Sequence, residues 1–145
     1  MKLHSDTPTG LNTVTAYGAD FIEINRERYY GAVAFAPEGE VAHWAAQTVA
    51  DLTLEQLQLA VGIAAAARDP FALLDDTPPA PTPGQAEVLL VGTGQRQHFL
   101  PPALLKPLLR AGVGVESMDT QAAARTYNIL MAEGRKVVAV LLPTA

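Results

Sequence analysis

The chain has 145 residues, of which 49% are hydrophobic and 17% charged, which is the size and composition of a single globular domain. Its net charge is −5 and its Lys and Arg residues are scattered, a pattern that argues against nucleic-acid binding. Cysteine is absent, which excludes disulfides, thiolate metal sites and a cysteine nucleophile. With no export signal and no apolar stretch near 20 residues, we expect one soluble, cytoplasmic domain over residues 1–145.

The first half of the chain predicts short antiparallel strands. Residues that favour β structure occur at 13–17, 21–24, 28–30, 31–36 and 41–44, and the stretch at 31–36 either continues the strand at 28–30 or starts another. Turn-forming residues separate them, at 18–20, 25–27 and 37–40. Several short strands joined by tight turns predict an antiparallel β-hairpin layer.

A helix is predicted to follow, up to about Ala67. Asp51 or Thr53 can cap it, and with Thr53 as the cap Gln56 completes a capping box. Apolar residues cover more than one face of this helix. Such a helix is either enclosed within the domain or shared with a partner, so a homodimer is possible.

A proline-rich stretch at 75–84 interrupts the pattern. Proline fixes φ and removes backbone donors, so neither a helix nor a sheet can run through this stretch. We interpret it as a surface loop within the single domain.

The second half alternates strands with helices. Strands are expected at 87–91, 113–118 and 136–142, of which the first and last are apolar after their first residue, as is typical of buried strands. Helices are expected at 101–111 and 121–133. Pro107 lies inside the first of these helices, where we expect a kink or a break. Right-handed crossovers between the strands would give a mostly parallel sheet in a three-layer α/β/α core.

A glycine loop, Gly92-Thr93-Gly94, follows the first buried strand. Ligands of open α/β sheets bind beyond the carboxyl ends of strands, and Arg96 could pair with an anion there. The pattern is not a dinucleotide-binding fingerprint, because Gln97 replaces its third glycine. The alternative is a tight turn that needs positive φ.

Polar residues at the last helix extend this candidate site. Asp119 and Thr120 start the helix, and Arg125 and Asn128 lie on one of its faces. Together with the glycine loop they would form a polar crevice at the strand ends. The alternatives are helix capping for the first pair and a solvated helix face for the second.

No catalytic, metal or cofactor constellation is present in the sequence. His4, His43 and His98 lack metal-ligand spacing. His98 alone lies near the glycine loop, so a hydrolase or transferase that uses it is the weakest hypothesis. We therefore expect no enzyme, no catalytic residues, no metal and no cofactor.

Several runs resemble a known family: LLVGTGQRQ at 89–97, GVESMDT at 114–120 and AARTYNIL at 123–130. The family consists of small proteins of unassigned bacterial function and includes the mitochondrial respiratory complex I assembly factor 3. The resemblance covers nearly the whole chain, and 75–84 looks like an insertion in it. It implies a mixed central sheet with helices on both sides and an added β layer.

The resemblance also implies a role in assembly with a protein partner, and it supplies no catalytic residues. Our leading hypothesis is a non-enzymatic factor that binds a protein during assembly of a respiratory membrane complex, with a complex subunit or another assembly factor as partner. The alternative is a domain that binds a small molecule or an anion at the glycine loop. The candidate residues of the crevice are Gly92, Thr93, Gly94, Arg96, Asp119, Thr120, Arg125 and Asn128.

Overall fold

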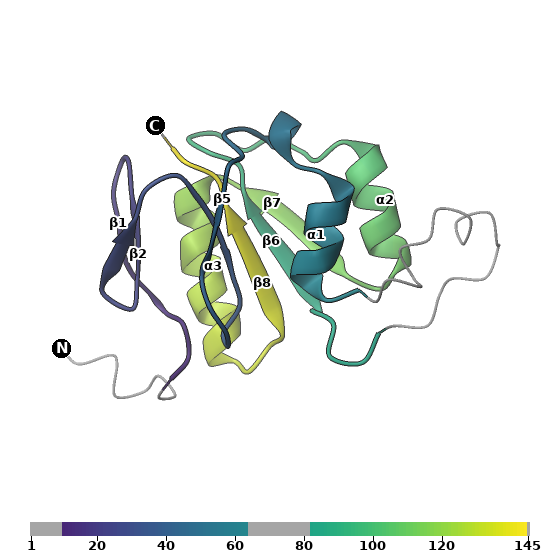
Figure 1. The fold of residues 1–145 in the computed structure, drawn as a ribbon, viewed down its shortest axis with the longest axis horizontal. Coiled ribbons are helices and arrows are strands. Elements are labelled where there is room, and N and C mark those ends of the chain that lie inside the picture. Colours follow the sequence, from purple (N-terminus) through teal and green to yellow (C-terminus); the bar gives the residue numbers. More distant parts are fainter. Residues whose placement is uncertain (1–9, 64–81, 145) are drawn as a thin grey trace.

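A computed structural model describes residues 10–63 and 82–144 of the chain (Figure 1). Most of the proline-rich stretch at 75–84 lies outside the described residues, as does the end of the helix predicted to reach Ala67. Within the described part, two sheets and three α-helices form an α/β fold, which confirms the predicted fold class.

The larger sheet is mixed and has the strand order β5-β4-β8-β6-β7. Its strands are β4 (Ala32–Phe35), β5 (Ala42–Trp44), β6 (Val88–Gly92), β7 (Gly114–Met118) and β8 (Val137–Leu141). Strands β7, β6 and β8 are parallel, as their helical connections require. The hairpin β4–β5 adds antiparallel to β8 and makes β5 one edge of the sheet.

The smaller sheet is antiparallel and comes from the N-terminal part of the chain. It consists of β1 (Val14–Tyr17), β2 (Ile22–Ile24) and β3 (Glu27–Tyr29). Asn25 and Arg26 both have positive φ, the geometry of a two-residue hairpin turn. The predicted turn at 25–27 is therefore confirmed for Asn25 and Arg26, whereas Glu27 already belongs to β3.

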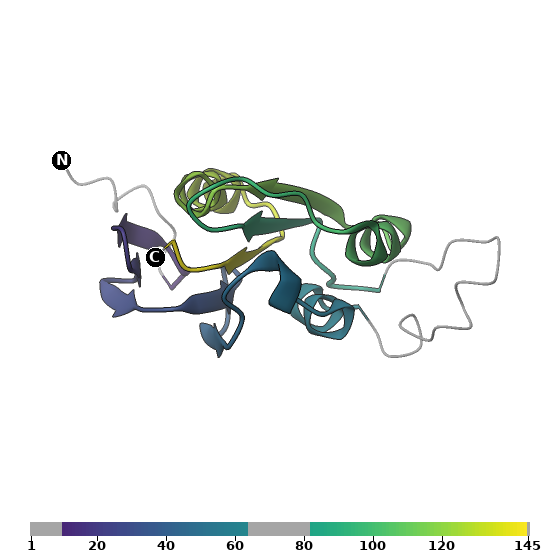
Figure 2. The same ribbon diagram turned by 90° about the horizontal axis from the view of Figure 1, so that it is seen from above.

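The helices cover both faces of the larger sheet. Helix α3 (Thr120–Ala132) lies between this sheet and the smaller one, whereas α1 (Leu54–Val61) and α2 (Pro102–Arg110) lie on the opposite face (Figures 1 and 2). A short 3-10 helix, η2 (Val49–Asp51), precedes α1. This arrangement is the expected three-layer core with an added β layer.

Helix α1 begins as predicted but ends earlier. The hydroxyl of Thr53 accepts a hydrogen bond from the backbone N–H of Gln56. Gly62 ends the helix in the left-handed conformation, with φ of 82°, and the N–H of Ile63 bonds back to Gln58. Glycine adopts this conformation without steric cost, which makes it a common residue at the end of a helix.

We expected a kink or a break at Pro107, and helix α2 continues through this residue without a break. The residues on either side of it, Leu104 and Leu108, are buried in the core and hold both halves of the helix on the sheet. In a helix of only nine residues, the loss of one hydrogen bond is offset by this packing.

The core consists of two layers, one on each face of the larger sheet. Side chains of α1 and α2 pack on one face, around Leu57 and Leu108. Side chains of α3 and the smaller sheet pack on the other, around Ile24 and Tyr127. None of the helices in residues 10–63 and 82–144 combines the length and hydropathy needed to cross a membrane.

Candidate functional site

Five of the predicted crevice residues meet at the carboxyl ends of β6 and β7. Gly92 is the last residue of β6, and Thr93 and Gly94 follow it. Asp119 and Thr120 follow β7 and begin α3. Because β6 and β7 are parallel neighbours, their carboxyl ends lie at the same edge of the sheet.

The buried side chain of Thr120 ties this edge together. Its hydroxyl accepts a hydrogen bond from the N–H of Gly94 at 2.9 Å and donates to the carbonyl of Leu142 at 2.7 Å. Its own N–H donates to the carbonyl of Gly94 at 2.9 Å. Thr120 thus joins the glycine loop, the start of α3 and the end of β8.

The two glycines of the loop are required by close approach. A Cβ atom on Gly92 would lie 2.8 Å from the Cα atom of Thr120, which is a clash with the backbone of α3. Gly94 has φ of 105°, and a Cβ there would lie 3.3 Å from the carbonyl oxygen of Pro143. Both glycines are explained by packing of the turn.

Thr93 and Asp119 also make hydrogen bonds within the chain. The buried Thr93 hydroxyl donates to the carbonyl of Arg96 at 2.7 Å and accepts from the N–H of His98 at 3.0 Å. The Asp119 carboxylate caps α3 by accepting from the N–H of Ala122 at 2.9 Å. Side-chain and backbone groups at the base of the loop are therefore engaged internally, and the exposed part is its tip, 95–99.

Arg125 and Asn128 face the smaller sheet instead of the glycine loop. Asn128 accepts a hydrogen bond from the N–H of Val14 at 2.9 Å and donates to the carbonyl of the same residue at 2.7 Å. The Arg125 guanidinium donates to the hydroxyl of Tyr17 at 2.8 Å. These two residues attach α3 to β1, on a different side of α3 from the contacts of Thr120.

Sequence reasoning missed Tyr127 as part of this attachment. Its ring is buried against Phe35, with ring centroids 4.7 Å apart, and its hydroxyl donates to the carbonyl of Asn12 at 2.7 Å. Burial raises the pKa of Tyr127 above the ordinary value of tyrosine, so the hydroxyl stays a donor. An apolar helix face gave no signal of this contact with a residue 115 positions away.

Asn12 in turn fixes the turn between β4 and β5. Its side-chain amide donates to the carbonyls of Ala36 at 2.8 Å and Gly39 at 2.9 Å, and its N–H donates to the carbonyl of Pro37 at 2.8 Å. The amide of Asn25 donates to the side-chain oxygen of Asn12. A buried network therefore runs from α3 through Asn12 to the turn at 37–40.

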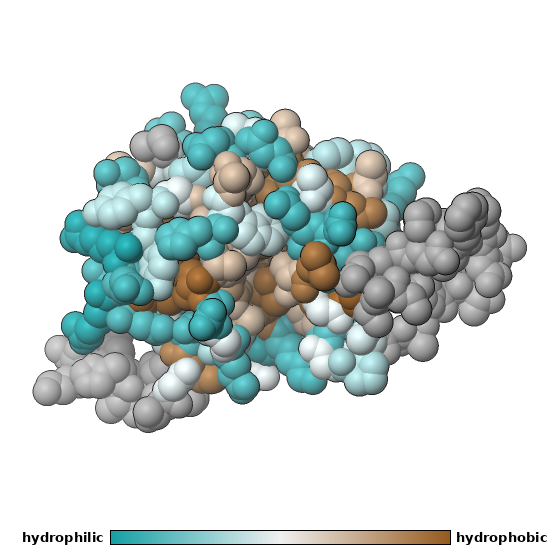
Figure 3. Space-filling view, viewed as in Figure 1, coloured by the Kyte–Doolittle hydropathy of each residue, from teal (hydrophilic) through white to brown (hydrophobic). Residues whose placement is uncertain are grey.

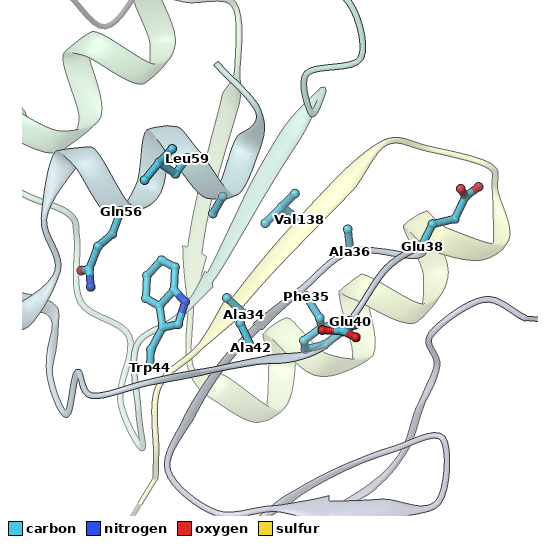
Figure 4. A pocket seen from close by; sticks show the side chains of 11 residues that line it. Ala34, Phe35, Ala36, Glu38, Glu40, Ala42, Trp44, Gln56, Leu59 and Val138 are labelled. Atoms are coloured by element: carbon cyan, nitrogen blue, oxygen red, sulfur yellow. The ribbon is translucent and has the colours of Figure 1, made fainter. Parts of the chain in front are cut away.

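An apolar groove lies next to this turn, between α1 and the β4–β5 hairpin (Figure 4). It has a volume of about 400 Å³, and β5, an edge strand of the larger sheet, contributes to its lining. Its lining includes Ala34, Trp44, Leu59 and Val138, and Glu38 and Glu40 stand at one end. Apolar side chains are visible on this face of the molecule between α1 and β5 (Figure 3).

Two exposed apolar side chains lie beside the groove and in the glycine loop, and the sequence had singled out only the first of them, Leu59. Leu59 on α1 is 57% exposed beside the groove, and Phe99 at the tip of the glycine loop is 82% exposed. For Leu59 a signal existed, because the apolar pattern around α1 covers more faces than the core can bury. Phe99 had no comparable signal, since one aromatic residue in a loop is common.

Among the described residues, no group of three or more His, Asp or Glu side chains is placed to hold a metal ion. His98, the one histidine near the glycine loop, contributes its backbone N–H to Thr93. Its side chain has no acidic partner in the described parts of the chain.

The chain is similar to named animal proteins over almost its full length. It is 29% identical to "NADH dehydrogenase [ubiquinone] 1 alpha subcomplex assembly factor 3" of Bos taurus over 97% of the chain. The protein of the same name in Xenopus tropicalis is 31% identical over 90% of the chain. The match spans only 65% and 60% of the lengths of these two relatives.

A solved bacterial structure shares the fold. The solution structure of a Bordetella pertussis protein, described as a Mth938-like domain, is 59% identical, with a TM-score of 0.74. The superposition covers 100% of this chain and 94% of that one. A family profile described as "Protein of unknown function (DUF498/DUF598)" matches residues 14–142. The chain therefore belongs to the DUF498/DUF598 family.

Proposed function

We propose that this protein is a non-enzymatic cytoplasmic factor that binds a protein partner during assembly of a respiratory complex related to complex I. The observation that carries the proposal is the similarity to animal assembly factor 3, which extends over 97% of the chain in the bovine case. The partner is a subunit of the complex or a second assembly factor.

The structure supports a binding role because most polar side chains of the predicted crevice, Arg96 excepted, form hydrogen bonds within the fold. The side chains of Thr120, Tyr127 and Asn128 each form hydrogen bonds with other parts of the chain. Leu59 and Phe99 instead expose large apolar side chains, which are typical of protein interfaces. Leu59 lies on a helix, and Phe99 lies on a loop whose base is held by hydrogen bonds. Less conformational entropy is therefore lost when a partner binds these side chains.

The experiment is affinity purification of the tagged full chain from its native cells, with cross-linking and mass spectrometry. We expect recovery of respiratory-complex subunits or of another assembly factor above an untagged control. Cross-links should place the partner beside Leu59 or Phe99. If tagged and untagged cells give the same proteins, the assembly role is wrong.

A second candidate is binding of an anion or a small molecule at Gly92-Thr93-Gly94. One observation favours it: Arg96 is exposed at the tip of the loop, and its guanidinium makes no hydrogen bond or ion pair with the described residues. A thermal-shift screen of small anions and metabolites tests it. A hit that Arg96→Ala abolishes and Arg26→Ala leaves intact would support this candidate, and a screen without hits would contradict it.

A further inference from the structure

We propose that the groove between α1 and the β4–β5 hairpin binds a segment of the partner protein that combines apolar side chains with Lys or Arg. This inference rests on the proposed function and assigns to it a surface and a partner chemistry. The apolar lining selects the first property of the segment, and the acidic end of the groove selects the second.

The walls of the groove come from elements that the core holds in place. Gln56 and Leu59 belong to α1, while Trp44 belongs to β5 (Figure 4). Neighbouring turns of α1 bury Leu57 and Val61, so the orientation of the helix is fixed. A volume of about 400 Å³ lies within the range of ligand pockets and has room for several apolar side chains.

The acidic end of the groove is pre-organised. Glu38 and Glu40 are exposed, and neither forms an ion pair with any described residue. The turn that carries them is held by three hydrogen bonds from Asn12, which is itself buried. Two carboxylates on a fixed turn attract a cation without the cost of ordering the backbone.

Charge decides between the possible occupants. An acidic segment would face Glu38 and Glu40 and be repelled. A second copy of this chain would bring the same acidic turn and a net charge of −5 to the interface. A basic and apolar segment of another protein is complementary to both features, in the manner of a peptide or helix laid into a groove.

The chain contains its own reporter, because Trp44 is the only tryptophan and lines the groove. The probes are three synthetic amphipathic peptides with the same leucine stripe, flanked by lysine, glutamine or glutamate. We expect the lysine peptide to shift the emission of Trp44 to shorter wavelength and to saturate. The glutamine peptide should bind more weakly, and the glutamate peptide should leave the emission unchanged.

Two pairs of variants locate the binding. Replacing both groove carboxylates, E38Q with E40Q, should weaken the lysine peptide about fivefold and remove most of its salt dependence, since exposed ion pairs are individually weak. The control is E116Q, an exposed carboxylate on β7 at the opposite edge of the sheet. Leu59→Ser should weaken binding about tenfold, whereas Ile129→Ser, on α3 and 59% exposed, should not.

Three outcomes would overturn the proposal: no peptide alters the emission of Trp44, the glutamate peptide binds as well as the lysine peptide, or the Leu59 and Ile129 variants weaken binding equally. The same two variants in the affinity purification separate this inference from the proposed function. A respiratory partner that Leu59→Ser retains in full would overturn the groove and leave the assembly role standing. Peptide binding at the groove, without recovery of any respiratory partner, would contradict the assembly role and leave the groove proposal standing.

Discussion

At the residue scale, the family-like motif is explained by internal contacts. Gly92 lacks a side chain because α3 begins against it, and Thr120 satisfies backbone groups of the glycine loop and of the chain after β8. The sequence placed these two residues together because parallel strands end at a common edge. It could not show that the contact between them leaves no room for a side chain.

Asn128 and Arg125 show where sequence reasoning stopped. Their helical spacing placed them on one face, but the choice between solvent, crevice and another element depends on partners more than 100 positions away. Both partners, Val14 and Tyr17, lie on β1. The position of β1 follows from packing of two separate sheets on α3, which no local pattern reports.

The close contact at Gly92 gives a prediction at this scale. Gly92→Ala should lower the free energy of unfolding by about 2 kcal/mol, because the new methyl group meets the backbone of Thr120 at 2.8 Å. Gly114 offers a matched control, since a Cβ there would have no neighbour closer than 3.5 Å and its φ is not in the left-handed region. Urea unfolding followed by circular dichroism measures both variants. Equal stability of the two would show that the loop can move away from α3.

At the element scale, α3 is the part that joins the two sheets. Its inner face packs on the larger sheet through Ala123 and Ala124, and its other side holds β1 through Asn128. The sequence predicted the helix with Asp119 or Thr120 as its cap, and Asp119 is the cap in the structure; both features are local. The antiparallel pairing of β4 with β8 joins the two halves of the chain, so local patterns could not predict it. Only the family resemblance implied a mixed sheet.

The double hydrogen bond from Asn128 predicts a local effect. Asn128→Ala removes both partners of Val14 and should raise the population of a state in which β1–β3 is detached. We expect amide hydrogen exchange of residues 14–29 to report a loss of about 2 kcal/mol, with β6 and β8 less affected.

Gln121→Ala, on the same helix, serves as the control for this experiment, because no hydrogen bond of Gln121 to the described residues is lost. If exchange rises equally in all strands, the two sheets unfold as one unit. α3 would then not act as a separable attachment.

At the scale of the whole molecule, the same network that holds the sheets together also shapes the surface. Tyr127 and Asn12 connect the buried face of α3 to the acidic turn at the groove. The groove therefore depends on the complete fold and not on α1 alone. Composition predicted a single acidic domain, but a surface assembled from α1, β4, β5 and β8 could not be predicted from any one segment.

The acidic surface also bears on self-association, which the apolar pattern of α1 had left open. A symmetric dimer through α1 would bury Leu59 of both copies, but it would bring together two acidic turns and two chains of net charge −5. We expect light scattering coupled to size exclusion to give the monomer mass for the wild type and for Leu59→Glu, even at high protein concentration. Ile129→Glu is the matched control on α3, with nearly the same exposure. A dimer mass that Leu59→Glu abolishes and Ile129→Glu retains would show that a second copy occupies this face. The groove would then be closed to a basic partner until the dimer dissociates.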